Sequence, residues 1–254
     1  MIRAAARTQL LELFIKSRTW LRQRGYELVH APSGTLLGMH LWMVFTHFHI
    51  NAVIDVGARR GEYGTWLRRN GYEGWIFSFE PVGKSFAALS RRAAQDERWI
   101  VRQVALGRET GTADINVMEK TNFSSFLTPS AYAAETFGSE SAITATEAVE
   151  MNTLDGVINE LLVDIADPHI YLKLDTQGWD LEVLRGATRC LPSIDALQTE
   201  LAAQPVYEGM PSMRESLDYL DASGFDVSGF FPVNLDRMLR AVEFDCVAVR
   251  RPVA

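Results

Sequence analysis

Short apolar runs recur along this chain, and most are followed by polar residues and then by a segment with helical spacing. The runs lie at 52–54, 75–79, 99–104, 169–174 and 196–201. Strand-length apolar runs that alternate with helical patterns are typical of βαβ units, which build a parallel sheet. The pattern therefore predicts an α/β domain over residues 51–254. Helices are predicted at 85–96, 181–191 and 213–223, and the last pair of strands is predicted at 225–230 and 246–250.

Residues 1–50 have a different pattern and are predicted to form an N-terminal helical extension. Positions 3–24 place apolar residues on one helical face, and their six lysines and arginines oppose a single acid, Glu12. A basic amphipathic helix of this kind can lie on a membrane surface or bind an acidic partner. Packing on its own domain or on a second copy of the chain is favoured over both, which are left open. Residues 36–50 carry three histidines without the spacing of a helical zinc pair, so no metal is assigned there.

The carboxyl ends of the first two predicted strands carry glycines and acids. Asp55 and Gly57 follow the first strand, Gly61 comes four residues later, and Glu80 ends the second strand. In an open parallel sheet, ligands bind outside the carboxyl ends of the strands. An acid about 20 residues beyond the glycine turn is placed to accept hydrogen bonds from a ribose diol. This stretch therefore predicts a site for a nucleoside-bearing cofactor.

The glycine spacing separates two classes of cofactor. A dinucleotide site needs the pattern G-x-G-x-x-G, because the backbone must cradle a pyrophosphate. Here Ala58 stands directly after Gly57, and Gly61 is the next glycine, so that pattern is not met. The form D-x-G-A-x-x-G is the one that class I methyltransferases use for S-adenosylmethionine. Methyl transfer is therefore favoured over NAD-dependent chemistry.

Later strand ends add further polar residues and two loops. Asp175 ends the strand at 169–175 and shares a face with Lys173, while Glu200 lies near the end of the strand at 196–201. The loop at 121–126 is expected to wall the cofactor pocket. Residues 128–147 are small, polar and weakly periodic, and they are predicted to form a mobile lid or substrate loop.

Bulk composition excludes several classes of protein. A net charge of −7 argues against a nucleic-acid partner, because such binding needs clustered lysines and arginines. Cys190 and Cys246 are the only cysteines, which predicts no disulfide framework and indicates a reducing, cytoplasmic location. No stretch of 18 apolar residues and no secretion signal is found, so no transmembrane segment is expected.

Taken together, the motifs resemble the FkbM family of S-adenosylmethionine-dependent methyltransferases. The matching pieces run in family order over roughly residues 50–250. They are IDVGARRGEYG at 54–64, FSFEPVGKSFAAL at 77–89, VALG at 104–107, FSSF at 123–126, NTLD at 152–155, YLKLDTQGWDLEVLRGA at 171–187 and QTEL at 198–201. The resemblance implies a Rossmann-like class I methyltransferase fold, whose mostly parallel sheet has seven strands with helices on both faces.

The resemblance also implies cofactor contacts and a class of reaction. The contacts that it places are Asp55, Gly57, Ala58, Gly61, Glu80, Ala105 and Asp175. The implied acceptor is a hydroxyl of a sugar, glycan or polyketide-type natural product. Two positions depart from the residues that the family commonly carries. Arg59-Arg60 stands in place of an Asn and a small or apolar residue, and Asp180 stands in place of a Glu.

The expected mechanism is an in-line displacement, in which a substrate hydroxyl attacks the methyl carbon of the sulfonium. Asp175 and Glu200 are the candidate general bases for that hydroxyl. The same two acids could instead hold a divalent cation such as Mg²⁺, although no metal ligand is assigned. An NAD-dependent oxidoreductase and a non-catalytic domain that binds a nucleoside cofactor are the alternative functions.

Overall fold

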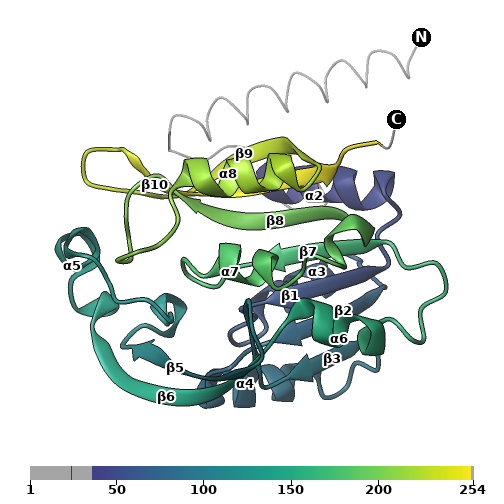
Figure 1. Cartoon of the computed structure of the whole chain (residues 1–254), viewed down its shortest axis with the longest axis horizontal. Coiled ribbons are helices and arrows are strands. Elements are labelled where there is room, and N and C mark those ends of the chain that lie inside the picture. Colours follow the sequence, from purple (N-terminus) through teal and green to yellow (C-terminus); the bar gives the residue numbers. More distant parts are fainter. Residues whose placement is uncertain (1–23, 25–35, 253–254) are drawn as a thin grey trace, which may run out of the picture. The chain divides into compact units, whose positions relative to one another are not determined.

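Seven strands form one twisted sheet in the order β3-β2-β1-β7-β8-β10-β9 (Figure 1). The computed structural model describes residue 24 and residues 36–252. The first five strands of this order pair in parallel, and β10 runs antiparallel to both of its neighbours. The strands are β1 Ala52–Val56, β2 Trp75–Phe79, β3 Trp99–Arg102, β7 Ile170–Leu174, β8 Ile194–Ala202, β9 Phe225–Leu235 and β10 Ala241–Arg250. This is the predicted fold class.

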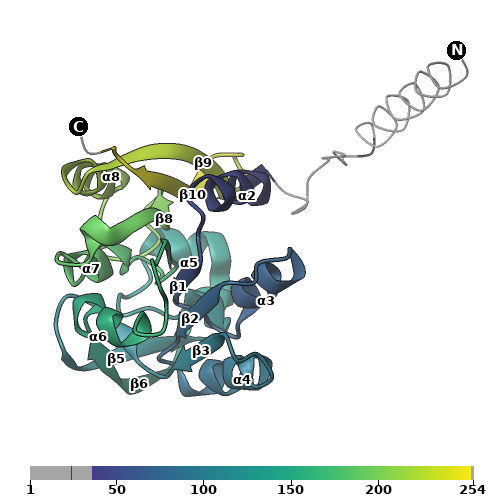
Figure 2. The ribbon, with the colours of Figure 1, turned by 90° about the vertical axis from the view of Figure 1, so that its right-hand side faces the viewer.

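Helices cover both faces of the sheet, as Figure 2 shows, with α3 and α4 on one side and α6, α7 and α8 on the other. These helices are α3 Glu62–Arg69, α4 Gly83–Ala93, α6 Leu154–Leu161, α7 Asp180–Arg185 and α8 Met213–Ala222. Local signals fix several of their ends: Thr153 caps α6 through its side chain, and Ser212 and Glu215 form a capping box at α8. The chain also forms α2 Leu36–His47 and the 3₁₀ turns η1 Thr121–Phe123, η2 Gly138–Ser141 and η3 Leu191–Ser193.

The central strands supply the main core. Every residue of β1 and of β7 is buried. Ile54 and Leu172 face the apolar side of α6 and α7 within one buried cluster. Because strands buried on both faces read as continuous apolar runs, this burial explains the pattern seen in the sequence.

A second sheet of three strands, in the order β4-β6-β5, lies beside the pocket described below. Its strands are β4 Ala105–Leu106, β5 Gly111–Met118 and β6 Ile143–Asn152. The prediction of a mobile loop over 128–147 was wrong, because this stretch holds the helix α5 Ala131–Phe137 and the start of β6. Ala133 is fully buried in a cluster with Phe123 and Tyr207. Small side chains such as this one can pack in a core, but they give little hydrophobic signal in the sequence.

The chain divides into two compact units, Met1–Trp42 and Met43–Ala254. The predicted basic helix at 3–24 lies outside the described residues except for Arg24, and the domain boundary at residue 50 stays a prediction. Within the described part of the chain, no helix combines the length and apolar character needed to cross a bilayer.

Close packing between α3 and β3 gives a test of the fold. A Cβ added at Gly64 would lie 2.2 Å from Cζ2 of Trp99, a buried side chain whose indole N–H donates to Ser78 Oγ at 3.0 Å. We expect Gly64→Ala to lower the free energy of unfolding by about 2 kcal/mol, because overpacking outweighs the better helix propensity of Ala. Urea denaturation measures this. Gly111→Ala, where an added Cβ meets no atom within 4 Å, is the control, and equal stability of the two variants would contradict the packing argument.

Candidate active site

A pocket of about 270 Å³ opens where the parallel strands end. The sheet order reverses between β1 and β7, which is the place where open α/β sheets bind ligands. The lining of the pocket comes from β1, β2, β4, β5, β8, β9 and β10, from the residues that directly follow β7, and from the loop at 121–126. The residues that line it include Gly57, Arg59, Glu80, Val82, Ala105, Ile115, Asn122, Phe126, Asp175, Gln177, Glu200, Asn234 and Glu243.

Gly57 lets the ends of β1 and β7 come together at the floor of the pocket. Its φ is +79°, and an added Cβ would lie 1.9 Å from the backbone oxygen of Asp175. A side chain is therefore excluded by contact as well as by conformation. The glycine found in the sequence is required by this approach of two strands.

Glu80 is held at the end of β2 by the main chain. The backbone N–H of Arg59 donates to Oε2 at 2.7 Å, and that of Val82 donates to Oε1 at 2.9 Å. Burial raises the pKa of Glu80 to about 7, although these two hydrogen bonds act in the opposite direction. Each oxygen keeps a lone pair for a further donor such as a ligand hydroxyl.

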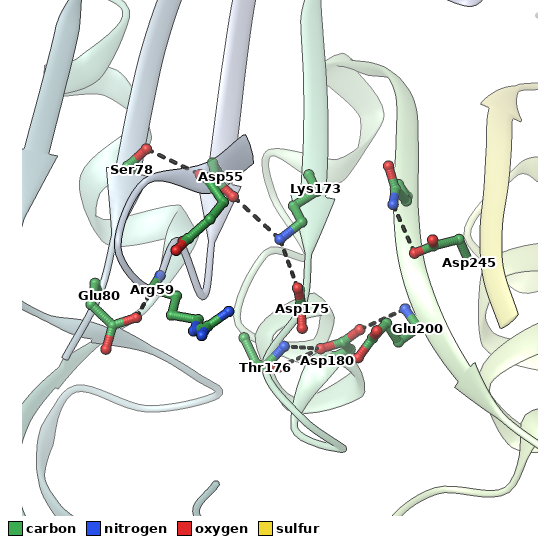
Figure 3. A network of polar contacts seen from close by, with 12 residues as sticks. Asp55, Arg59, Ser78, Glu80, Lys173, Asp175, Thr176, Asp180, Glu200 and Asp245 are labelled. Atoms are coloured by element: carbon green, nitrogen blue, oxygen red, sulfur yellow. Dashed lines mark hydrogen bonds and ion pairs between the residues drawn. The ribbon is translucent and has the colours of Figure 1, made fainter. Parts of the chain in front are cut away.

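A buried ion-pair chain crosses the strands beneath the pocket (Figure 3). Lys173 Nζ lies 3.5 Å from Asp55 Oδ1 and 3.0 Å from Asp175 Oδ2, and Ser78 Oγ donates to Asp55 Oδ2 at 3.1 Å. Burial acts to lower the pKa of Lys173, but the two carboxylates outweigh it and hold that pKa above its usual value. Burial raises the pKa of Asp55 despite Lys173. Burial likewise favours neutral Asp175, yet Lys173 and Gln177 lower its pKa.

Glu200 lies beside Asp175 on the pocket wall, but its pKa is shifted in the opposite direction. Burial raises its pKa well above the usual value, and the negative charges of Asp175 and Glu243 add to the effect. Gln177 Nε2 donates to Asp175 Oδ1 at 3.0 Å and to Glu200 Oε2 at 2.8 Å. The site thus holds one carboxylate that stays ionised and one that readily takes a proton.

Asp180 has a structural role that the sequence left open. Thr176 N donates to its Oδ1 at 2.8 Å, and Thr199 Oγ1 and Glu200 N donate to its Oδ2 at 2.8 and 3.0 Å. Asp180 is buried and ties the loop after β7 to the end of β8. It thereby fixes the backbone that carries Glu200.

Some of the site residues predicted from the sequence line the pocket, and others do not. The lining residues are Gly57, Glu80, Ala105, Asp175 and Glu200. Asp55 is fully buried below the pocket, the N–H of Ala58 is bonded to the Phe79 carbonyl oxygen, and Gly61 lies against Leu89 and Trp99. Contacts of Asp55, Ala58 and Gly61 with a cofactor stay predictions.

Sequence reasoning missed several polar residues of the pocket, among them Gln177 and Glu243. The sequence pattern assigned Gln177 no role, and Glu243 lies in a strand that was expected to begin at Cys246. Burial and, to a smaller extent, the negative charge of Asp175 raise the pKa of Glu243 to about 7. The available sequence signal for Glu243 was its place as an acid between two apolar residues, Val242 and Phe244.

Among the described residues, no group of three or more His, Cys, Asp or Glu side chains is arranged to hold a metal ion. Asp175, Glu200 and Glu80 are engaged by Lys173, by Gln177 and by backbone N–H groups, respectively. The described geometry therefore gives no support to the divalent cation that was the alternative to a general base.

Comparison with known proteins identifies one family. The profile described as "Methyltransferase FkbM domain" matches residues 55–227, which is more than half of the chain. The matched range includes the ends of β1, β2, β7 and β8 but not Glu243. Curated protein sequences gave no significant match.

Solved structures are similar over most of the chain at low sequence identity. An rRNA methylase from Streptococcus thermophilus is 11% identical, with 89% of this chain and 99% of that chain covered and a TM-score of 0.44. Magnesium protoporphyrin IX methyltransferase from Synechocystis PCC 6803, solved with bound SAM, is 10% identical, with coverages of 91% and 89% and a TM-score of 0.42. A protein of the NADB-Rossmann superfamily from Streptococcus agalactiae is 12% identical, with coverages of 87% and 71% and a TM-score of 0.45.

The raised pKa of Glu80 predicts how stability depends on pH. The folded protein binds this proton more tightly than the unfolded chain, whose glutamates have a pKa of 4.5. The stabilisation is fully present below about pH 4.5 and is lost as the pH rises through about 7, and it amounts to at most about 3 kcal/mol. Urea denaturation at about pH 5 and pH 8 should show a smaller loss of stability in Glu80→Gln than in the wild type. Glu109→Gln, at an exposed site, is the control, and equal losses in wild type and Glu80→Gln would refute the prediction.

Proposed function

The chain belongs to the FkbM methyltransferase family, and we propose that it methylates a hydroxyl oxygen of a sugar, glycan or polyketide-type natural product, with S-adenosylmethionine as the methyl donor. The observation that carries the proposal is the pair of unlike carboxylates, Asp175 and Glu200, on the wall of a pocket at the switch point of the sheet. A general base is useful for an alcohol acceptor, which is a poor nucleophile while it keeps its proton.

The residues of the pocket fit S-adenosylmethionine. Glu80 offers free lone pairs for a ribose diol, and Val82, Ala105 and Phe126 offer apolar surface for an adenine. Gly57 also lines the pocket, where it lets the ends of β1 and β7 come together. Buried polar atoms without a protein partner, Arg59 Nε and Asn122 Oδ1, belong to residues that line the same pocket. When bound, the donor supplies a methyl group made electrophilic by its sulfonium.

Glu200 is the better of the two candidate bases. A general base works best when its pKa lies near the working pH. Lys173 holds Asp175 in the ionised form and lowers its pKa, which makes Asp175 a weak base. The pKa of Glu200 is raised by burial and by neighbouring negative charge. Glu200 is therefore assigned to accept the proton of the acceptor hydroxyl, and Asp175 to contribute fixed negative charge next to it.

The acidic residues of the pocket wall also affect which acceptors can bind. Asp175, Glu200 and Glu243 all line the pocket, so a substrate that brings phosphates would meet negative charge. Hydroxyl groups can donate to these oxygens without that penalty. A neutral, hydroxyl-rich small molecule or glycan is accordingly proposed, and a nucleic acid is not.

Titration calorimetry with S-adenosylmethionine, S-adenosylhomocysteine and NAD tests the proposed donor. We expect both sulfur ligands to bind and NAD not to bind. Glu80→Ala should weaken binding by roughly tenfold or more, because it removes the acceptor of charge-assisted hydrogen bonds. Glu109→Ala, an exposed site outside the pocket, is the matched control. Preference for NAD, or no binding of either sulfur ligand, would refute the proposal.

Replacing the proposed base tests the chemistry. Glu200→Gln should lower kcat by about 10² to 10⁴ fold while donor binding persists, since a positioned base contributes about that much. Asp175→Asn should lower kcat by less, because Asp175 does not take the proton. Transfer of a radiolabelled methyl group to a panel of hydroxylated acceptors measures both. Unchanged turnover of Glu200→Gln would remove Glu200 from the mechanism.

A further inference from the structure

One amide side chain bridges the two unlike carboxylates of the pocket. Gln177 Nε2 lies 3.0 Å from Asp175 Oδ1 and 2.8 Å from Glu200 Oε2. An amide NH₂ has two hydrogens, so each carboxylate receives one of them. Gln177 lines the same pocket and links Asp175 to Glu200, in addition to the direct hydrogen bond between the two carboxyl groups.

The other end of this amide is fixed as well. Tyr207 Oη lies 2.8 Å from Gln177 Oε1 and 2.9 Å from the carbonyl oxygen of Phe123, so its single hydrogen is shared between these two acceptors. Ser125 Oγ donates to the backbone oxygen of Gln177 at 2.7 Å. Tyr207 is fully buried. These contacts turn the NH₂ end toward the acids and anchor the residue from both the backbone and the side chain.

The backbone at Gln177 is itself held in an unusual conformation. Its φ is +55°, in the left-handed region that costs a residue other than glycine roughly 1 kcal/mol. Gly178 directly follows it with a φ of +86°. Strain at a residue whose side chain bridges two candidate reactive groups indicates that the position of this side chain is functional.

The charges around Glu200 explain why it needs a donor. The titratable groups that act on it are Asp175 and Lys173 from β7 and its end, Asp180 from α7, Glu243 and Asp245 from β10, and Tyr207. Among these, Lys173 is the one cation, and it is already paired with Asp55 and Asp175. The N–H of Gln177 thus opposes a surplus of negative charge at Glu200.

We propose that Gln177 is a positioning residue, whose amide holds Asp175 and Glu200 at a fixed spacing and stabilises the ionised form of Glu200 that receives the proton of the acceptor hydroxyl. This inference rests on the proposed function, in which Glu200 is the base. Because a hydrogen bond to a carboxylate favours its charged form, loss of this amide shifts the ionisation of Glu200 to higher pH.

The test is Gln177→Met, which keeps the length and the unbranched Cβ of the side chain but removes its amide group and thus both N–H donors. In the pH profile of kcat/KM for methyl transfer, the acidic limb of this variant should move up by about one pH unit, the size expected for a lost hydrogen bond to a charged group. A residue with only a structural role would lower activity without moving that limb. A profile that falls evenly at every pH would overturn the proposal.

An infrared titration of the carboxyl groups keeps this test separate from that of the proposed function. The Glu200 signal is assigned by its loss in Glu200→Gln, and its midpoint is then compared in the wild type and in Gln177→Met. A midpoint that moves to higher pH supports the role of Gln177 even if no acceptor is turned over. An unmoved midpoint overturns it, whatever the activity.

Tyr207→Phe provides a second variant if Gln177→Met does not fold. It keeps the buried ring but removes the hydroxyl that directs the amide. The Glu200 midpoint should again move to higher pH, by less than in Gln177→Met, since the two donors remain but lose their fixed orientation. A midpoint unchanged in Tyr207→Phe overturns the proposal in the same way.

Discussion

The site depends on a single buried cation placed between two carboxylates. Lys173 pairs with Asp55 on the adjacent strand and with Asp175 at the end of its own strand. The register of β1 and β7 sets Asp55 directly beside Lys173, and that of β1 and β2 sets Ser78 beside Asp55, so a polar row crosses three strands of the core. Without Lys173, the buried carboxylate of Asp55 and the partly exposed carboxylate of Asp175 would lose their cation, and loss of one partner of a buried ion pair generally costs several kcal/mol. The same ion holds Asp175 charged, and that charge adds to the effect of burial in raising the pKa of Glu200.

The fold could be predicted from the sequence to a large extent, because its central strands are buried on both faces. Val53 and Ile54 of β1 and Leu172 of β7 lie within continuous apolar runs, and a polar residue directly follows each of these runs. The acid at Glu80 could be found because its distance from Gly57 is a property of a strand-helix-strand unit. These are local relations along the chain.

The remaining features depend on relations between distant segments. Asp55 follows an apolar run and seemed to face the ligand, yet strand register directs it to Lys173 beneath the pocket. Glu243 reaches the pocket only because β10 runs antiparallel beside β8, which its own sequence does not specify. The helix α5 is packed through small residues such as Ala133, which give a weak periodic signal. Tertiary contact decided each of these outcomes.

The turn at residue 59 shows how this site can vary between relatives. Arg59 stands where the resemblance to the FkbM family implies Asn, and its φ of +52° is a conformation that Asn adopts more readily than Arg. The contact that matters, however, runs from its backbone N–H to Glu80 at 2.7 Å. Every amino acid except proline has that N–H group, so the side chain at position 59 can change while Glu80 stays held in place. The exchange then costs backbone strain but keeps the hydrogen bond to Glu80.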